Sequence, residues 1–168
     1  SMGNKADLSE TDFLTAFAED PQTKVIVGYL ESIVAGDDFI KAAEAAASKK
    51  PVVVFKSGVT QAGVKAASSH TGSLAGADKA YGAAFARSGI IRAETFEALF
   101  DYATAFAMQP LPKGRRVAII TNAGGPGIMA ADAVELSGMK VGTLGGGTAT
   151  ALREKLPAAA SVGNPIDV

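Results

Sequence analysis

The run Pro51-Val52-Val53-Val54-Phe55-Lys56 is apolar and β-branched over most of its length. An unbroken run of this kind predicts a strand that is covered on both faces, because a strand with one wet face alternates apolar and polar residues. A second run, Lys24-Val25-Ile26-Val27-Gly28-Tyr29-Leu30, has the same character. The two runs predict buried strands of one parallel sheet.

Helical patterns surround these strands. Ser9, with Asp12 three residues later, predicts the start of a helix that Asp20-Pro21 ends. Further helices are predicted from about Asp37 to Ser48, from near Leu74 or Gly76 to Ser88, and after the capping residue Thr95, with a short strand over residues 89–93. The alternation of strands and helices predicts an α/β fold with a doubly wound parallel sheet.

A second domain is predicted beyond a linker. Residues 109–114, Gln-Pro-Leu-Pro-Lys-Gly, are typical of a linker. Strands are then expected over residues 116–121 and 141–144, and helices over residues 124–137 and 148–155. Since two strands and two helices do not complete a sheet, we interpret residues 115–168 as the first part of a second α/β domain, with residues 1–108 forming the first.

Composition narrows the classes of function. The chain has 168 residues, 48% of them hydrophobic, which is enough for a well-buried core. Its net charge of −1 and lack of a basic cluster disfavour nucleic acid and anionic membranes as partners. No apolar run reaches the roughly 18 residues of a membrane span. The absence of cysteine excludes disulfides and thiolate metal sites, and a single histidine makes a zinc site unfavourable.

The single histidine, His70, is the principal candidate for covalent chemistry. Imidazole titrates near neutral pH and is a competent nucleophile. His70 lies in a long connection, residues 57–76, that is polar, rich in glycine and predicted to lack regular structure. Connections of this length within a compact α/β unit are usually functional. A histidine beside serine and threonine can also simply cap a helix or occupy a loop, and this alternative stays open.

The residues around His70 favour an anionic ligand. A helix that begins near Leu74 or Gly76 would direct its free N–H groups and positive dipole end toward His70. One exposed helix end contributes only about 0.3–1 kcal/mol, so a second is required. The turn over residues 124–127, between a strand and a helix, could supply it. The candidate phosphate-binding residues are Ser69, Thr71, Gly72 and Ser73 in the first segment and Gly124, Gly125 and Gly127 in the second.

Glu31 is the candidate partner of His70. It follows the first predicted strand, and the connection that holds His70 follows the second strand, so both lie at the carboxyl edge of the predicted sheet, where ligands bind in such folds. A carboxylate that accepts a hydrogen bond from one imidazole nitrogen leaves the other nitrogen free to attack phosphorus. A glutamate at the end of a strand is also often simply solvated.

Two glycine motifs partly match nucleotide-binding loops. Residues 58–65 approach a Walker A loop, but Val64 separates the second glycine from Lys65 and no serine or threonine follows. Residues 125–130 fit the pattern G-x-G-x-x-A after a strand, but no acidic residue lies between Glu135 and Glu154, where a dinucleotide site requires one. Neither motif therefore supports a nucleotide site in this chain.

Six blocks in order resemble the NDP-forming acyl-CoA synthetases, the ADP-forming acetyl-CoA synthetase branch of the succinyl-CoA synthetase superfamily. The blocks are residues 1–7, Tyr29-Leu30-Glu31, residues 50–58, residues 69–76 with Ser-His-Thr-Gly-Ser-Leu-Ala-Gly, residues 121–127 with Thr-Asn-Ala-Gly-Gly-Pro-Gly, and Asn164-Pro165-Ile166-Asp167. The resemblance implies a flavodoxin-like ligase domain over residues 1–108, then part of a second flavodoxin-like domain.

The resemblance also implies an activity. In that family, acyl-CoA and phosphate give an acyl phosphate and CoA, a histidine takes the phosphoryl group, and ADP or GDP receives it. Carried over, His70 is the phosphoryl carrier and Glu31 its orienting partner, and the turns at residues 69–76 and 124–127 face the phosphate. An alternative is a ligand-sensing, non-catalytic synthetase-like region of a protein acetyltransferase.

The partners implied by the resemblance lie outside this chain. They are a CoA-binding Rossmann domain and an ATP-grasp domain that binds ADP or ATP with Mg²⁺, in the same chain or on another subunit. A small carboxylic acid is the expected substrate, and a cytoplasmic, oligomeric enzyme is expected. The segment alone is not expected to bind CoA or nucleotide tightly or to complete the reaction.

Overall fold

The computed structural model describes residues 5, 7–33, 35–71 and 78–168, and for residues 67–71 it describes the backbone alone. The chain divides into two compact units, Ser1–Leu111 and Pro112–Val168, and the predicted linker spans the point of division. The first unit contains α1 (Glu10–Glu19), β1 (Ile26–Leu30), α2 (Gly36–Ala47), β2 (Val52–Lys56), α3 (Gln61–Thr71), α4 (Asp78–Ser88), β3 (Ile91–Ala93) and α5 (Phe96–Met108).

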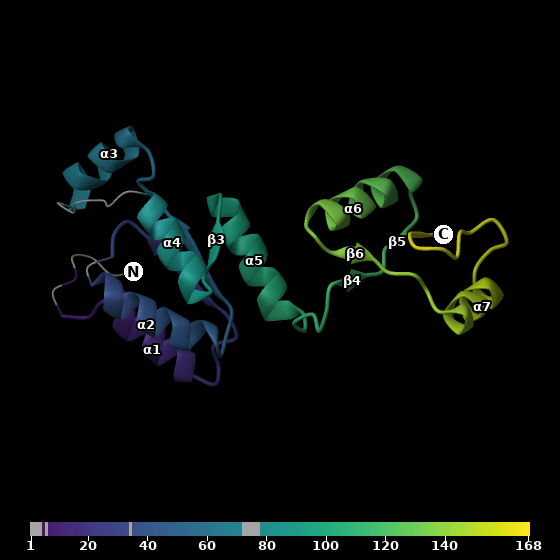
Figure 1. The fold of residues 1–168 in the computed structure, drawn as a ribbon, viewed down its shortest axis with the longest axis horizontal. Coiled ribbons are helices and arrows are strands. Elements are labelled where there is room, and N and C mark those ends of the chain that lie inside the picture. The colour runs from purple at the N-terminus through teal and green to yellow at the C-terminus, as the bar shows by residue number, and fades with distance from the viewer. Residues whose placement is uncertain (1–4, 6, 34, 72–77) are drawn as a thin grey trace. The chain divides into compact units, whose positions relative to one another are not determined.

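The first unit has the predicted parallel sheet, in the order β1-β2-β3. Register pairs Leu30 with Lys56 and Val54 with Arg92. Helices α1, α2 and α4 pack on one face of the sheet and α5 packs on the other (Figure 1). The α/β class with helices on both faces of a parallel sheet is thus confirmed.

Alternate residues of β2 bind the two helical layers to the sheet. Val52 and Val54 join a core with Phe39 of α2 and Phe85 of α4. Val53 joins a second core on the opposite face, and all three valines are buried. The unbroken apolar run of β2 is explained by this burial on both faces.

Two predicted helix starts are present with their capping residues. The Oδ2 atom of Asp12 accepts hydrogen bonds from the Ser9 N–H at 2.8 Å and the Ser9 hydroxyl at 2.7 Å. These bonds hold the pKa of the Asp12 carboxyl below its ordinary value, because they favour the ionised form. Thr95 accepts a hydrogen bond from the Ala98 N–H at 3.0 Å at the start of α5.

The prediction that residues 57–76 lack regular structure is wrong, because α3 occupies Gln61–Thr71. Thr60 caps this helix: its Oγ1 accepts from the Gly63 N–H at 3.1 Å and its carbonyl from the Val64 N–H at 2.8 Å. None of the α3 residues whose exposure is described is fully buried. Residues 61–66 of α3, whose exposure is described, thus offer no buried stripe that hydrophobic periodicity could reveal. The predicted helix start near Leu74 or Gly76 lies outside the described residues, which resume with α4 at Asp78.

The second unit contains β4 (Arg116–Val117), β5 (Ile120–Thr121), α6 (Gly124–Leu136), β6 (Lys140–Val141), α7 (Gly146–Lys155) and β7 (Ile166–Asp167). β4 pairs with β6, and β5 pairs with β7, both in parallel. The predicted helices are confirmed. The predicted strand 116–121 is wrong in its continuity, the strand predicted over residues 141–144 is limited to Lys140–Val141, and β7 was not predicted.

Asn164 accounts for the break between β4 and β5. The Gly142 N–H donates to the Val117 carbonyl at 3.0 Å, so a regular parallel ladder would next join the Ile119 N–H to the Gly142 carbonyl. The side-chain amide of Asn164 takes both places. It accepts from the Ile119 N–H at 2.9 Å and donates to the carbonyls of Gly142 at 2.7 Å and Val117 at 2.8 Å. Ile119 then accepts from the Ile166 N–H at 2.8 Å, which begins the pairing with β7.

Replacing Phe39 by alanine is expected to lower the free energy of unfolding of the first unit by about 3–5 kcal/mol, because Phe39 is 1% exposed and the cavity cannot refill. The three tyrosines, Tyr29, Tyr81 and Tyr102, all lie in this unit, so tyrosine fluorescence during urea denaturation reports on it alone. Phe100→Ala is the control, since Phe100 is 55% exposed, and its loss should stay below about 1.5 kcal/mol. Equal losses would contradict the placement of the core.

Replacing Asn164 by alanine should increase the hydrogen-exchange rate of the Ile119 amide by about 10-fold, because the bond that protects it is lost. Exchange followed by NMR measures this directly. The exposed Asn122→Ala serves as the control and should leave that rate unchanged. A protected Ile119 amide in the Asn164 variant would show that another group satisfies the break.

Candidate functional site

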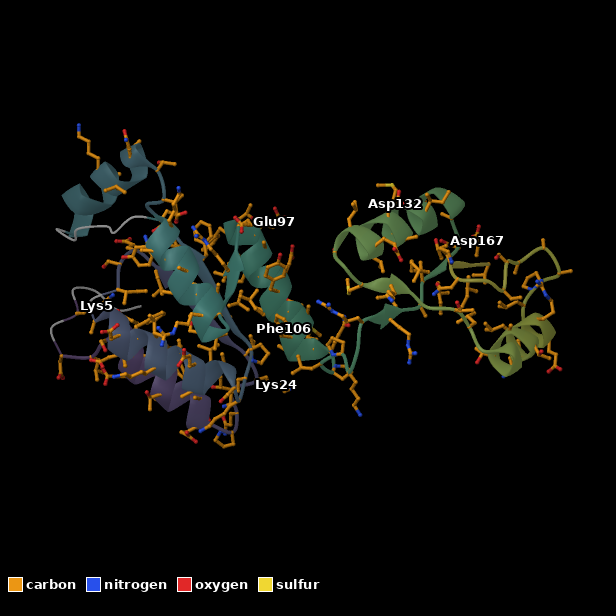
Figure 2. All side chains as sticks on the ribbon, viewed as in Figure 1. Lys5, Lys24, Glu97, Phe106, Asp132 and Asp167 are labelled. Carbon is orange, nitrogen blue, oxygen red and sulfur yellow. The ribbon has the colours of Figure 1, made fainter. Side chains whose placement is uncertain are left out.

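The carboxyl edge of the sheet carries the first group of candidate residues. Glu31 directly follows β1 and Ser57 directly follows β2, and the Ser57 N–H donates to the Leu30 carbonyl at 3.0 Å. The edge therefore brings together the Glu31 segment and the start of the connection to His70, as the sequence predicts. Lys5 holds the segment after Glu31, since its Nζ donates to the Ser32 carbonyl at 2.7 Å and pairs with Glu10 at 2.8 Å. Lys5 is labelled in Figure 2.

His70 lies near the carboxyl end of α3, as do Ser69 and Thr71. The side chains of all three residues lie outside the described part of the structure, as do Gly72 and Ser73 entirely. The pairing of Glu31 with His70 and the phosphate contacts of this segment therefore stay predictions. In the loop that leads into α3, Gly58 has a φ of 68°, a backbone conformation that residues other than glycine rarely adopt.

Lys56 is a buried cation at this edge that the sequence analysis did not single out. Its side chain is 3% exposed, its ammonium group donates to the Ser57 carbonyl, and Nζ lies 4.5 Å from the centroid of the Tyr81 ring. Burial lowers the pKa of Lys56 below its ordinary value. The Asp78 and Glu31 carboxylates oppose this shift. The feature of the sequence that could have identified Lys56 is a charged residue at the end of an unbroken apolar strand.

Arg92 adds a second cation from the neighbouring strand. Its Nη2 lies 2.6 Å from Oδ1 of Asp78, the first residue of α4. An open hollow of about 290 Å³ lies beside it, lined by residues of β2 and β3 and the loops that follow them, among them Ser57, Gly58, Thr60 and Glu94. The carboxyl edge is thus both charged and hollowed, as a ligand site in an α/β sheet requires.

The second group of candidates begins α6 in the second unit. The Gly127 N–H donates to the Ala123 carbonyl at 3.2 Å, so the N–H groups of Gly124 and Gly125 are the ones left at the helix end. Gly127 has a packing role, because a Cβ there would lie 2.9 Å from Cγ2 of Thr121. A Cβ on Gly124 would lie 3.4 Å from Oδ2 of Asp167, a carboxylate that the sequence analysis did not place here. Figure 2 shows Asp167 near this end of α6.

Across the described ranges, no cluster of three or more histidine, aspartate or glutamate side chains could hold a metal ion. Within the same ranges, no helix is long and apolar enough to cross a bilayer.

Comparison with known proteins gives a consistent set of relatives. The chain is 48% identical over 168 residues to the ADP-forming acetate–CoA ligase I of Archaeoglobus fulgidus, and 46% identical over 168 residues to the alpha subunit of ADP-forming acetate–CoA ligase II of Pyrococcus furiosus. Both matches span 100% of this chain, but they span only 24% of the first relative and 36% of the second.

A solved structure agrees. Acetyl-coenzyme A synthetase 1 of Candidatus Korarchaeum cryptofilum, in complex with phosphate and ADP, matches 99% of this chain with a TM-score of 0.89 and 40% sequence identity. The match covers 36% of that protein. Residues 1–106 match the family model described as the succinyl-CoA ligase like flavodoxin domain. On these matches, the chain belongs to the family of succinyl-CoA-ligase-like flavodoxin domains.

Proposed function

We propose that this chain is the phosphoryl-carrier core of an acid–CoA ligase that makes ATP from ADP. The observation that carries the proposal is its only histidine, His70, which follows the carboxyl edge of a parallel sheet in a chain 46–48% identical, over its whole length, to ADP-forming acetate–CoA ligases. Residues 1–108 act as the histidine domain and residues 115–168 as the start of its companion domain.

The proposed reaction has three steps. Phosphate attacks the acyl carbon of an acyl-CoA, the carbon–sulfur bond breaks, and an acyl phosphate and CoA result. The free nitrogen of His70 then attacks phosphorus, and the bond from phosphorus to the acyl oxygen breaks to release the carboxylate. Finally an oxygen of the β-phosphate of ADP attacks the phosphohistidine, the phosphorus–nitrogen bond breaks, and ATP forms. The first transfer leaves His70 phosphorylated, and the second, to ADP, regenerates the free imidazole.

Glu31 has the role of orienting the imidazole in this proposal. Its carboxylate accepts the N–H of one ring nitrogen, which fixes the tautomer and exposes the other nitrogen to phosphorus. The position of Glu31 at the edge where the α3 connection departs supports the pairing. The ladder to Ser57 and the Lys5 hydrogen bond to Ser32 restrict the movement of the backbone on either side of Glu31.

Two segments of the chain are proposed to bind phosphate. One contains Ser69, Thr71, Gly72 and Ser73, and the other offers the free N–H groups of Gly124 and Gly125 at the start of α6. Gly127 contributes by allowing α6 to approach Thr121 closely. The Asp167 carboxylate lies beside Gly124, with Oδ2 at 3.4 Å from the position that a Cβ on this glycine would take.

The rest of the enzyme is proposed to lie outside this chain. Its relatives are roughly three to four times as long, which leaves room for the CoA-binding Rossmann domain and the ATP-grasp domain that the reaction needs. Mg²⁺ would enter with the nucleotide there. A small carboxylic acid is the proposed substrate, a cytoplasmic oligomer the proposed setting, and the isolated chain would not turn over. The acetyltransferase-linked sensing alternative gains no support from relatives that are named as ligases.

The complete ligase, incubated with ATP and Mg²⁺, should acquire a phosphoryl group that is labile in acid and stable in base. Trypsin releases residues 66–79, which contain His70 as their only histidine, so mass spectrometry can locate the group on that peptide. His70→Asn should abolish it, because the amide is not a nucleophile for phosphorus. The exposed Lys41→Gln is the control and should label normally. An acid-labile label that survives in the His70 variant would overturn the proposal.

The isolated chain tests the Glu31 pairing, because its one histidine gives one imidazole signal in an NMR titration. Glu31→Gln should lower the pKa of His70, since removing a neighbouring carboxylate destabilises the charged imidazolium. Glu97→Gln removes an exposed carboxylate on α5 and should leave the titration unchanged. Equal titration curves for wild type and the Glu31 variant would exclude the pair in the free domain.

A further inference from the structure

Two cations at the sheet edge have no part in the mechanism proposed above. We infer that Lys56 and Arg92 are positioning residues that hold the first turn of α4 against the carboxyl ends of β2 and β3, and that this anchor at Asp78, close after His70 in the sequence, is required for the reaction of His70. This inference rests on the proposed role of His70.

Both cations project from the same face of the sheet. Arg92 is the register partner of Val54, and Lys56 lies two residues beyond Val54 along β2, so the three side chains share one face. Val54 packs in the core that contains Phe85 of α4. The face that carries the two cations is therefore the face that α4 covers.

Arg92 binds the start of α4 directly. The guanidinium Nη2 donates to Oδ1 of Asp78 at 2.6 Å, and the two side chains are 24% and 39% exposed. A Cβ on Gly82, one helical turn after Asp78, would contact Nη1 of Arg92 at 3.6 Å. The guanidinium thus lies along the first turn of the helix. Asp78 is also favoured there because a carboxylate stabilises the positive end of a helix.

Lys56 of β2 contacts the same turn of α4 through Tyr81. Its ammonium lies over the Tyr81 ring at 4.5 Å and is attracted by the Asp78 carboxylate. No carboxylate among the described residues lies within ion-pair distance of Lys56. A buried ammonium without such a pair is costly, and an apolar residue would serve the core better. A positioning role for the charge explains its presence here better than packing does.

The other end of α4 provides the matched comparison. Arg87, in the last turn, lies 3.4 Å from Glu44 of α2, and these side chains are 73% and 44% exposed. This pair also ties α4 to its surroundings, but at the end away from His70 in the sequence. If the ion pairs at the two ends of α4 affected His70 only by stabilising the fold, the loss of rate in each variant would follow its loss of thermal stability.

The experiment measures His70 phosphorylation by ATP in the complete ligase, with Lys56→Met, Arg92→Met, Asp78→Asn and the control Arg87→Met. Loss of the first-turn contacts should lower the rate constant of phosphorylation about 10- to 100-fold, because misplacing a nucleophile by about 1 Å has effects of this size. The KM for ATP should change by less than twofold, since the nucleotide binds elsewhere. Arg92→Lys, which keeps the charge, should recover part of the rate.

The outcomes separate the two proposals. If the wild-type enzyme forms no acid-labile group on residues 66–79, the proposed function fails. If wild type is labelled and the three first-turn variants react at the wild-type rate, the positioning inference is wrong. Equal slowing by Arg87→Met would also overturn it. Thermal unfolding of each variant is measured in parallel, and if the buried Lys56→Met fails to fold, the partly exposed Asp78→Asn and Arg92→Met variants decide.

Discussion

The parallel ladder that joins β1, β2 and β3 is the interaction on which the first unit depends. Its middle strand alternates its side chains between two helical layers, so Val52 and Val54 bury Phe39 and Phe85 on one face while Val53 buries Leu99 on the other. The backbone bonds of the ladder run to the last residue of β2, and the Ser57 N–H extends them to Leu30. Backbone hydrogen bonds thus continue to the edge where Glu31 and the α3 connection leave the sheet.

Charge is concentrated at that edge for a physical reason. The strands end there, so side chains that follow them are no longer required to be apolar, and Glu31, Lys56, Arg92 and Asp78 gather within the reach of one another's fields. Lys56 ends β2, Arg92 lies in β3 and Asp78 begins α4, so the backbone of each of these three charged residues belongs to a strand or a helix.

The second unit differs from the first in how its strands pair. Its strands are short, and the backbone between β4 and β5 changes partner from β6 to β7. The amide of Asn164 makes this change possible by satisfying the Ile119 N–H and the Gly142 carbonyl together. The same region brings Asp167 beside the start of α6, so the end of the chain helps to form the helix terminus at which phosphate is proposed to bind.

The sequence by itself determined the α/β class, the buried strands and the capped starts of α1 and α5, because each depends on local pattern: apolar runs and capping residues. It also placed Glu31 and the His70 connection at one edge, since parallel strands end together. Only the tertiary structure decided that α3 is a helix, that β4 and β5 are separate, and that Lys56, Asp78 and Arg92 meet. The last two features depend on contacts between residues distant in sequence, which leave no periodic signal in the chain. For α3, none of the residues 61–66 is fully buried, so this described part has no apolar stripe that could signal a helix.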